Sequence, residues 1–302
     1  MVVVGPGCWL CRNGIRAASS GFAPNMTIQG LGRFGVWRYY SAFTPEQARE
    51  LEGLGYSTLW LGGSPPADLP VVESLLEATE TQLVGTSIVN VWSTSADEVA
   101  ESFHRIDGRF PGRFILGIGV GHPENDSVYR KPYDALVDYL DVLDKAGVPK
   151  ERRALAALGP RVLELARDRT AGALPYLAPP EHTRRARETL GGDALLVAEN
   201  KVVLDTDAER ARGTGRNMVK MYLGLTNYVT NLRRLGYSDE DVAKPGSDHL
   251  IDDLALHGTA EEIAAGLVAH LTAGADQIAV QALDEDYLAT LRALAPALGA
   301  RV

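Results

Sequence analysis

Strand-like and helix-like segments alternate about eight times along this chain, and this alternation restricts its fold more than any other feature. Apolar runs of strand length occur at residues 33–37, 57–61, 83–91, 113–119, 153–157, 172–175, 200–204 and 277–283. Helix-type patterns fill the gaps between them, and three open on capping boxes that begin at Thr44, Ser95 and Thr259. Short connections between alternating strands and helices produce a parallel sheet with right-handed crossovers. Eight such units predict an α/β fold of the (β/α)8 type, a closed TIM barrel.

Two segments fall outside this regular pattern. Residues 1–30 are rich in Gly, Pro and Ser without periodicity, and we expect a disordered N-terminal extension there. Residues 31–302 are then expected to form one catalytic barrel domain, because no linker divides them. Residues 207–235 are mostly helical and longer than one crossover requires. They predict a helical insertion before the last strand, which either covers the rim of the barrel or builds a subunit interface.

Charge and cysteine content exclude several classes of function. The formal net charge is −9 without a basic cluster, which is unfavourable for binding nucleic acid or an anionic membrane. No apolar run reaches the ~18 residues that a membrane-spanning helix needs. The only cysteines are Cys8 and Cys11, whose spacing fits a redox pair or half a zinc site, but no second pair completes that site. We interpret them as part of an accessory tail, and the lack of a disulfide framework fits a cytoplasmic protein.

One stretch, from Pro111 to Asn125, combines a strand with an unusual end. Phe114 to Ile118 is continuously apolar, as expected for a strand buried on both faces. Gly119, Gly121, His122 and Asn125 follow, so bare backbone and polar side chains meet at one rim. The dinucleotide fingerprint G-x-G-x-x-G is not satisfied, because the third glycine is misplaced and no helix opens directly.

In barrels of this kind the chemistry lies at the C-terminal ends of the strands. The side chains expected at that rim are Arg38, Tyr39, Tyr40, Gly62, Gly63, Ser64, Asn90, Trp92, Gly121, His122, Asn125, Leu158, Gly159, Pro160, Arg161, Tyr176, Gln281 and Asp284. The set is rich in aromatic and backbone groups and poor in carboxylates. It therefore suits a flat aromatic cofactor better than two-carboxylate or metal-assisted hydrolysis.

No motif for a metal or for nucleophilic catalysis accompanies this rim. The six histidines form neither H-x-H nor H-E-x-x-H. His249 and Asp253 are four residues apart and could share a helix face, and we interpret them as a solvated surface pair. Neither a G-x-S-x-G nucleophile elbow nor a G-x-x-x-x-G-K-[ST] loop is present. We expect no metal site.

Three stretches together resemble the luciferase-like superfamily of flavin- and deazaflavin-dependent oxidoreductases. They are residues 83–90, residues 110–122 and residues 156–160, and the resemblance extends over about 31–298. The pattern is most similar to the actinobacterial branch that uses coenzyme F420. The resemblance implies a TIM-barrel oxidoreductase, a small organic substrate and a homodimer.

The resemblance also implies a set of cofactor-binding residues. Ser87-Ile88 matches a non-prolyl cis peptide behind the deazaflavin ring, with Asn90 supporting that ring. Val120, Gly121 and His122 match the rim beside the ring and substrate, and His122 is the candidate proton donor or acceptor. An ordinary loop histidine is an equally good interpretation of His122. Ala157, Leu158, Gly159, Pro160 and Arg161 match a turn into a helix whose free N–H groups favour a phosphate, with charge added by Arg161.

One departure from the family pattern concerns the substrate. Relatives that oxidise sugar phosphates carry an Asp-His pair after the second strand, whereas Gly62-Gly63 stands here. This argues against sugar-phosphate oxidation and predicts open volume for a bulkier substrate. Trp37, Trp92 and Tyr176 are candidates for an apolar substrate wall, and a role in the barrel core or at the surface is an equally good interpretation of each.

The predicted function is hydride transfer between coenzyme F420 and an organic substrate. Two alternatives remain. One is an FMN-dependent monooxygenase with the same fold. The other is a barrel that has lost catalysis and acts as a binding protein.

Overall fold

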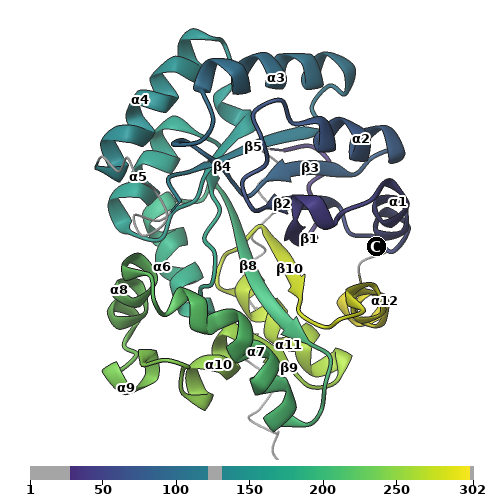
Figure 1. Ribbon diagram of the computed structural model, residues 1–302, viewed down its shortest axis with the longest axis vertical. Helices are drawn as coiled ribbons and strands as arrows, with labels where there is room; N and C mark the ends of the chain where they lie inside the picture. Colours follow the sequence, from purple (N-terminus) through teal and green to yellow (C-terminus); the bar gives the residue numbers. More distant parts are fainter. Residues whose placement is uncertain (1–27, 122–130, 300–302) are drawn as a thin grey trace, which may run out of the picture.

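The structure is a computed structural model that describes residues 28–121 and 131–299. Ten strands form one parallel sheet: β1 (Phe34–Tyr39), β2 (Thr58–Gly62), β3 (Leu83–Thr86), β4 (Val89–Asn90), β5 (Phe114–Gly119), β6 (Arg153–Leu155), β7 (Gly172–Ala173), β8 (Leu195–Val203), β9 (Ala255–His257) and β10 (Gln277–Ala282). β1 pairs with both β2 and β10, and β10 also pairs with β8, so the sheet closes on itself. Because β3 and β4 are two halves of one interrupted strand and β9 lies outside the ring, the result is an eight-stranded barrel (Figure 1). The predicted TIM barrel is confirmed.

Helices cover the outside of the barrel. The helices that follow the barrel strands are α1 (Pro45–Gly53), α2 (Pro70–Ala78), α3 (Ala96–Arg109), α4 (Pro132–Lys145), α5 (Pro160–Arg169), α6 (Pro180–Leu190), α11 (Ala260–Thr272) and, after the last strand, α12 (Tyr287–Leu298), with short 3-10 turns at Tyr40–Ala42 and Lys150–Arg152. Five of these helices begin with Pro at the first turn, where the missing N–H group costs nothing.

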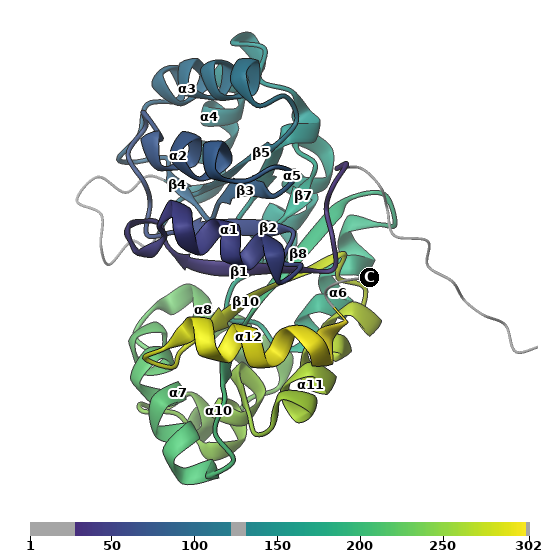
Figure 2. The same ribbon diagram turned by 90° about the vertical axis from the view of Figure 1, so that its right-hand side faces the viewer.

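The predicted helical insertion is also present. Between β8 and β10 the chain forms α7 (Ala208–Tyr222), α8 (Thr226–Leu235), α9 (Asp239–Val242) and α10 (Asp248–Leu254), followed by β9. Figures 1 and 2 show α7, α8 and α10 at the lower end of the molecule, away from α2, α3 and α4 at the upper end. Eleven buried apolar residues of this region, among them Val219, Leu232 and Leu250, form a separate core together with Leu177.

Two further hydrophobic cores lie on the two sides of the barrel strands, one between the strands and the outer helices and one inside the barrel. The larger core lies between strands and helices and includes Val36, Leu59 and Phe114. The smaller core fills the barrel and includes Trp37 and Trp60. Val36 and Trp37 belong to different cores because successive strand residues point to opposite faces.

Large and small residues alternate inside the barrel to fill it. A Cβ added at Gly85 would lie 2.3 Å from Cζ3 of Trp60, so glycine on β3 makes room for the indole on β2. The Trp60 indole Nε1 donates a hydrogen bond to Oε1 of Gln277 over 2.7 Å. This interdigitation is what a closed barrel interior requires.

Three local expectations need correction. β8 runs from Leu195 rather than from residue 200, because all nine of its residues are buried and the strand pairs with β7 at its start. The capping boxes at Thr44 and Thr259 form, but Ser95 makes no side-chain cap hydrogen bond with α3. Ile28 is 2% exposed and packs in the barrel core, so the packed chain begins before residue 31.

Within residues 28–121 and 131–299, none of the helices is long and apolar enough to cross a membrane.

Candidate functional site

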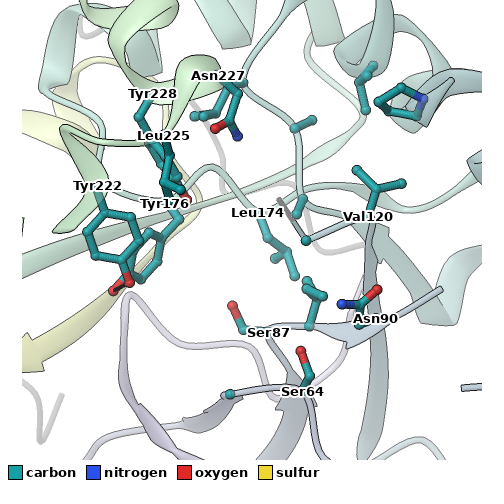
Figure 3. A pocket seen from close by; sticks show the side chains of 18 of the residues that line it. Ser64, Ser87, Asn90, Val120, Leu174, Tyr176, Tyr222, Leu225, Asn227 and Tyr228 are labelled. Atoms are coloured by element: carbon teal, nitrogen blue, oxygen red, sulfur yellow. Dashed lines mark hydrogen bonds between the residues drawn. The ribbon is translucent and has the colours of Figure 1, made fainter. Parts of the chain in front are cut away.

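A pocket of about 500 Å³ lies where the barrel strands end, beside the junction of α7 and α8 (Figure 3). The residues of the described chain that line it are Trp37, Tyr39, Gly63, Ser64, Ser87, Ile88, Asn90, Val120, Gly121, Pro132, Leu136, Ala156, Ala157, Leu158, Gly159, Val162, Leu174, Tyr176, Met221, Tyr222, Leu225, Asn227 and Tyr228. Most follow the carboxyl ends of β1 to β7, which is the rim predicted from the sequence. The pocket thus lies where barrels of this kind hold their ligands.

One side of the pocket, the strand-end face, consists of Ser87, Ile88, Asn90, Val120, Gly121 and residues 156–159. The peptide bond between Ser87 and Ile88 is cis, which confirms the geometry that the family resemblance implied. This bond lies between β3 and β4 and interrupts the third barrel strand. Gly121 has φ of 57°, a left-handed conformation that favours glycine.

The glycines on β5 make room for the neighbouring backbone, where β3 and β4 are interrupted, and not for a ligand. A Cβ at Gly119 would lie 2.8 Å from Cγ1 of Ile88, and a Cβ at Gly117 would lie 1.9 Å from the Thr86 carbonyl oxygen. The Thr86 hydroxyl donates to the Gly117 carbonyl and accepts from its N–H, both over 2.8 Å. Gly117 and Gly119 therefore shape the neighbouring backbone, whereas Gly121, just after the strand, lines the pocket.

Trp92 stabilises the strand-end face through hydrogen bonds from outside the pocket. Its backbone N–H donates to Oδ1 of Asn90 over 3.0 Å, and its indole Nε1 donates to the Val120 carbonyl over 2.6 Å. Trp92 therefore ties Asn90 to Val120, but it is not among the lining residues. The prediction that Trp92 belongs to the substrate wall is not supported.

The start of α5 forms one end of the strand-end face. Ala157, Leu158 and Gly159 line the pocket, and Gly159 is the N-cap of α5 without a side-chain cap. Pro160 and Arg161 do not line it, and the Arg161 guanidinium lies 4.6 Å from the Tyr133 ring centroid. The backbone at residues 157–159 thus borders the pocket, whereas the side chain of Arg161 packs on Tyr133 outside it.

A buried histidine, His182, stabilises the turn that leads into α5. Nε2 of His182 lies 3.0 Å from the Leu158 carbonyl oxygen and must carry the proton to donate to it. Burial lowers the pKa of His182, so the ring stays neutral near pH 7. His182 lies outside the pocket and positions one of its walls.

The opposite side of the pocket is aromatic. Trp37, Tyr39, Tyr176, Tyr222 and Tyr228, called here the aromatic wall, come from β1, from the loop after β7 and from α7–α8. The ring centroids follow one another at 5.5 Å, 5.1 Å, 5.3 Å and 5.0 Å in the order Tyr39, Trp37, Tyr176, Tyr222 and Tyr228. Figure 3 shows Tyr176, Tyr222 and Tyr228 together across the pocket from Asn90 and Val120.

The predicted open volume near Gly62-Gly63 is filled by this wall. A Cβ at Gly62 would lie 2.0 Å from Cζ2 of Trp37, and a Cβ at Gly63 would lie 2.7 Å from Cδ1 of Tyr39. The two glycines admit aromatic rings from the neighbouring strand. The space beside the two glycines is therefore occupied by the Trp37 and Tyr39 rings and does not add to the cavity.

A hydrogen-bonded chain runs behind the wall. The Tyr222 hydroxyl donates to the Tyr176 hydroxyl over 3.0 Å, which donates to Oε1 of Gln281 over 2.9 Å. Burial raises the pKa of Tyr176 well above its usual value, so this phenol is neutral at physiological pH. Gln281, predicted at the rim, supports the wall without lining the pocket.

A buried ion pair lies under the wall. Nζ of Lys201 is 2.9 Å from Oε1 and 3.0 Å from Oε2 of Glu199, and 3.9 Å from the Tyr176 ring centroid. Oε2 of Glu199 also accepts from the Leu177 N–H over 3.0 Å. Burial lowers the pKa of Lys201, and the Glu199 carboxylate opposes that shift. The pair fixes the loop that carries Tyr176, and Lys201, 0% exposed, cannot reach a ligand.

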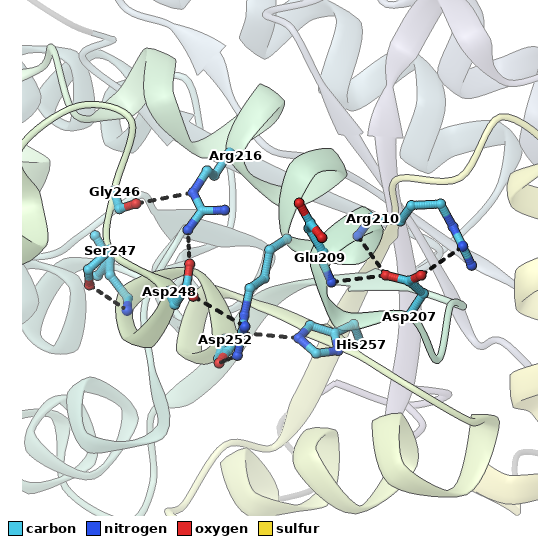
Figure 4. A network of polar contacts seen from close by, with 11 residues as sticks. Asp207, Glu209, Arg210, Arg216, Gly246, Ser247, Asp248, Asp252 and His257 are labelled. Atoms are coloured by element: carbon cyan, nitrogen blue, oxygen red, sulfur yellow. Dashed lines mark hydrogen bonds and ion pairs between the residues drawn. The ribbon is translucent and has the colours of Figure 1, made fainter.

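Ion pairs anchor α7, which carries Met221 and Tyr222, to the rest of the insertion (Figure 4). Arg212 contacts Asp252 through Nη2 over 2.6 Å, and Nε2 of His257 contacts the same carboxylate over 3.0 Å. Arg216 pairs with Asp248 at the start of α10. The contact with Arg212 lowers the pKa of Asp252, so this carboxylate stays charged near neutral pH.

His122, the candidate proton carrier, and Asn125 lie outside the described residues. So do Cys8 and Cys11. Within the described part of the chain, no group of three or more His, Cys, Asp or Glu side chains could hold a metal ion. His249 and Asp253 are 3.7 Å apart and the histidine side chain is 70% exposed, which fits the predicted surface pair.

Sequence reasoning missed the lining residues from α7 and α8, namely Met221, Tyr222, Leu225, Asn227 and Tyr228. The available signal was the excess length of residues 207–235, which predicted either a rim cover or a subunit interface. The structure supports the rim cover, because the end of α7 and the start of α8 form one wall of the pocket.

Comparisons with known proteins agree with this fold. Residues 31–152 match the family model of luciferase-like monooxygenases. A search of curated protein sequences gave no significant match.

Solved structures extend the likeness to almost the whole described chain. An F420-dependent secondary alcohol dehydrogenase in complex with an F420-acetone adduct has a TM-score of 0.71 at 13% identity, covering 89% of this chain and 98% of that one. The coenzyme F420-dependent tetrahydromethanopterin reductase from Methanopyrus kandleri has a TM-score of 0.64 at 14% identity, covering 89% and 99%. The oxygenating constituent of 3,6-diketocamphane monooxygenase from Pseudomonas putida, in complex with FMN, has a TM-score of 0.66 at 12% identity, covering 89% and 99%.

At these identities the structural likeness establishes a shared fold. The family-model match over residues 31–152 agrees with the resemblance inferred from the sequence, and the whole barrel shares its fold with these solved structures.

Proposed function

We propose that this protein is an oxidoreductase that binds coenzyme F420 on the strand-end face of the pocket and transfers hydride to or from an organic substrate. The observation that carries the proposal is the two-sided pocket. Small and backbone-rich residues from β4, β5 and the start of α5 form one face, and the aromatic wall forms the other.

The residues present fit a flat cofactor with a phosphate. Gly121, Ala156 and Ala157 present little side-chain bulk, so a planar ring can approach the backbone. Leu158 and Gly159 lie at the N-terminus of α5, where N–H groups and the helix dipole favour an anion. Ser87 and Asn90 supply polar groups on the same face. When bound, F420 would supply the hydride chemistry, while the protein orients it and limits the access of water.

A second candidate is an FMN-dependent monooxygenase. The matching family model is that of luciferase-like monooxygenases, and one structural neighbour holds FMN. Both cofactors have a tricyclic ring of similar outline, so the strand-end face suits either.

Direct titration of the purified protein with F420 and, separately, with FMN separates the two candidates. We expect F420 to bind at least about tenfold more tightly than FMN, measured by quenching of cofactor fluorescence. The reverse order would favour the monooxygenase, and absence of binding by both would favour the non-catalytic alternative. Arg161→Glu provides a control at the phosphate end. Because its guanidinium packs on Tyr133 outside the pocket, we expect less than about a threefold change in F420 affinity.

A further inference from the structure

The aromatic wall offers a continuous apolar surface to a second ligand beside the cofactor. Its five rings contact one another in T-shaped or tilted arrangements, with neighbouring centroids 5.0 to 5.5 Å apart. Trp37, Tyr222 and Tyr228 are 4%, 7% and 6% exposed, so their positions are held by packing. Such a surface binds aromatic or polycyclic groups through buried area and ring contacts.

The mouth of the pocket is apolar as well. Three large apolar side chains are exposed in the part of the chain that the structure describes: Tyr39, Met221 and Val268. Tyr39 is 43% exposed and Met221 is 53% exposed, and both line the pocket. Exposed apolar side chains that border a cavity are typical of a binding surface. Methionine side chains are flexible and fit ligands of different shapes.

Charge is missing from the described lining. None of the lining residues in 28–121 and 131–299 is Asp, Glu, Lys, Arg or His. The buried charges beneath the wall, Lys201 and Glu199, satisfy each other and are sealed from the pocket. A substrate carboxylate or ammonium group at the wall would lose its hydration without meeting an opposite charge there.

A few neutral polar groups do face the cavity. Asn227, on the first turn of α8, lines the pocket, as do Ser64 and Ser87 on the other side. Figure 3 shows the Asn227 amide and the two serine hydroxyls on opposite sides of the space. An amide or a hydroxyl can donate to a carbonyl or accept from an alcohol.

We propose that the substrate is an uncharged molecule with an aromatic or polycyclic body and a carbonyl or hydroxyl group, seated against the aromatic wall. The inference rests on the proposed function for the presence of a cofactor on the strand-end face. It adds the substrate class and assigns specificity to Met221 at the mouth and Asn227 in the α8 turn.

The test compares two ligands that differ in one charge. 4-Acetylbiphenyl is neutral, and 4′-acetylbiphenyl-4-carboxylate is its anionic counterpart. Affinities are measured by calorimetry on the full-length protein loaded with the cofactor that the titration above identifies. We expect the neutral ketone to bind at least about tenfold more tightly, because the carboxylate must be desolvated. Tighter or equal binding of the carboxylate, or no binding of the neutral ketone, would overturn the proposal.

A pair of exposed sites provides a matched control. Met221→Lys places a cation at the mouth and is expected to raise the affinity of the carboxylate at least about fivefold relative to the ketone. Val268→Lys makes the same change on α11, outside the lining, and is expected to leave the ratio unchanged. An equal shift in both variants would mean a general charge effect and would remove Met221 from the specificity argument.

The substitution Asn227→Asp tests the neutral polar group of α8 by measuring the affinities of the same two ketones. The new carboxylate is expected to weaken the neutral ketone at least about threefold and the anionic ketone further, whereas Asn217→Asp, exposed on α7, changes neither. Unchanged binding in Asn227→Asp would remove this residue from the site.

Failure of the proposed function remains distinguishable from failure of this inference. If neither F420 nor FMN binds, the proposed function fails, and the two ketones are then measured on the protein without cofactor. A preference for the neutral ketone there would still support the substrate class, and its absence would overturn it.

Discussion

At the scale of single residues, the pocket depends on glycines whose role differs from the one expected. Gly119 is the last residue of β5, and the sequence predicted that it presents bare backbone at the rim. The structure instead places it against Ile88, which belongs to the strand-end face. The residue is therefore needed for the shape of the pocket although it does not line it.

Gly119→Ala should consequently damage cofactor binding. Its Cβ would lie 2.8 Å from Cγ1 of Ile88 and 3.2 Å from Cβ of Ala156, so both lining residues must move. We expect at least about a tenfold loss of cofactor affinity, and a decrease of about 1–3 kcal/mol in the free energy of unfolding from overpacking. Titration and urea denaturation measure the two effects.

The matched control is Gly108→Ala on α3, where an added Cβ meets nothing within 4 Å. It should leave affinity unchanged and stabilise the helix by up to about 1 kcal/mol. Equal affinities for the Gly119 and Gly108 variants would refute the role assigned to Gly119.

At the scale of elements, similar sequence patterns produced different caps. Thr259 accepts from the Glu262 N–H, and the Glu262 side chain accepts from the Thr259 N–H over 2.8 Å. Ser95 precedes α3 with the same pattern, yet its side chain makes no cap hydrogen bond. The pattern therefore locates the start of each helix, whereas the local backbone decides whether the cap forms.

This difference predicts unequal costs for two substitutions at helix starts. Thr259→Ala should lower the free energy of unfolding by about 1 kcal/mol, because the side-chain half of its capping box is lost. Ser95→Ala should cost less than about 0.5 kcal/mol, because no cap bond exists to be lost. Urea denaturation of the two variants in parallel checks the prediction, and equal costs would contradict the cap assignment.

At the scale of the whole molecule, a buried histidine links a barrel strand to two of the helices that surround the barrel. Nδ1 of His270, on α11, lies 2.9 Å from the Thr183 hydroxyl of α6, and Nε2 lies 3.1 Å from Nδ2 of Asn200 on β8. The Asn200 amide donates to Nε2, so the neutral ring carries its proton on Nδ1. Burial lowers the pKa of His270 from 6.5 to about 4.

The depressed pKa predicts that the fold loses stability in mild acid. In the unfolded chain the His270 ring takes up a second proton near pH 6.5, whereas in the folded protein it does so only near pH 4. The free energy of unfolding is therefore highest above pH 6.5 and falls as the pH drops from 6.5 towards 4. Between pH 7 and pH 5 the loss due to His270 should be about 2 kcal/mol. His182, whose pKa burial also lowers, acts in the same direction.

Urea denaturation at both pH values measures this loss. His270→Gln should reduce the difference between the two pH values by about 2 kcal/mol, whereas His104→Gln, at an exposed site, should leave it intact. A wild-type pH dependence retained in His270→Gln would exclude this histidine as its source.

The sequence by itself determined the architecture and one face of the site. Each strand and helix carries its own periodicity, turn residues and first-turn signals, and eight alternating units have few ways to pack other than a closed barrel. The strand ends of a parallel barrel share one rim. Ser87, Asn90, Gly121 and residues 157–159 could therefore be assigned to one site from their positions in the chain and from the family pattern.

Only the tertiary structure decided the other face and the use of individual side chains. Tyr222 and Tyr228 lie far from Trp37 in the chain, and no local pattern specifies how the α7–α8 junction folds over the rim. Whether Trp92 or Arg161 reaches the pocket depends on the nearest competing partner, which is the Val120 carbonyl for one and the Tyr133 ring for the other. Local sequence governs where an element begins and ends, whereas the direction of a long side chain is settled by contacts between residues distant in sequence.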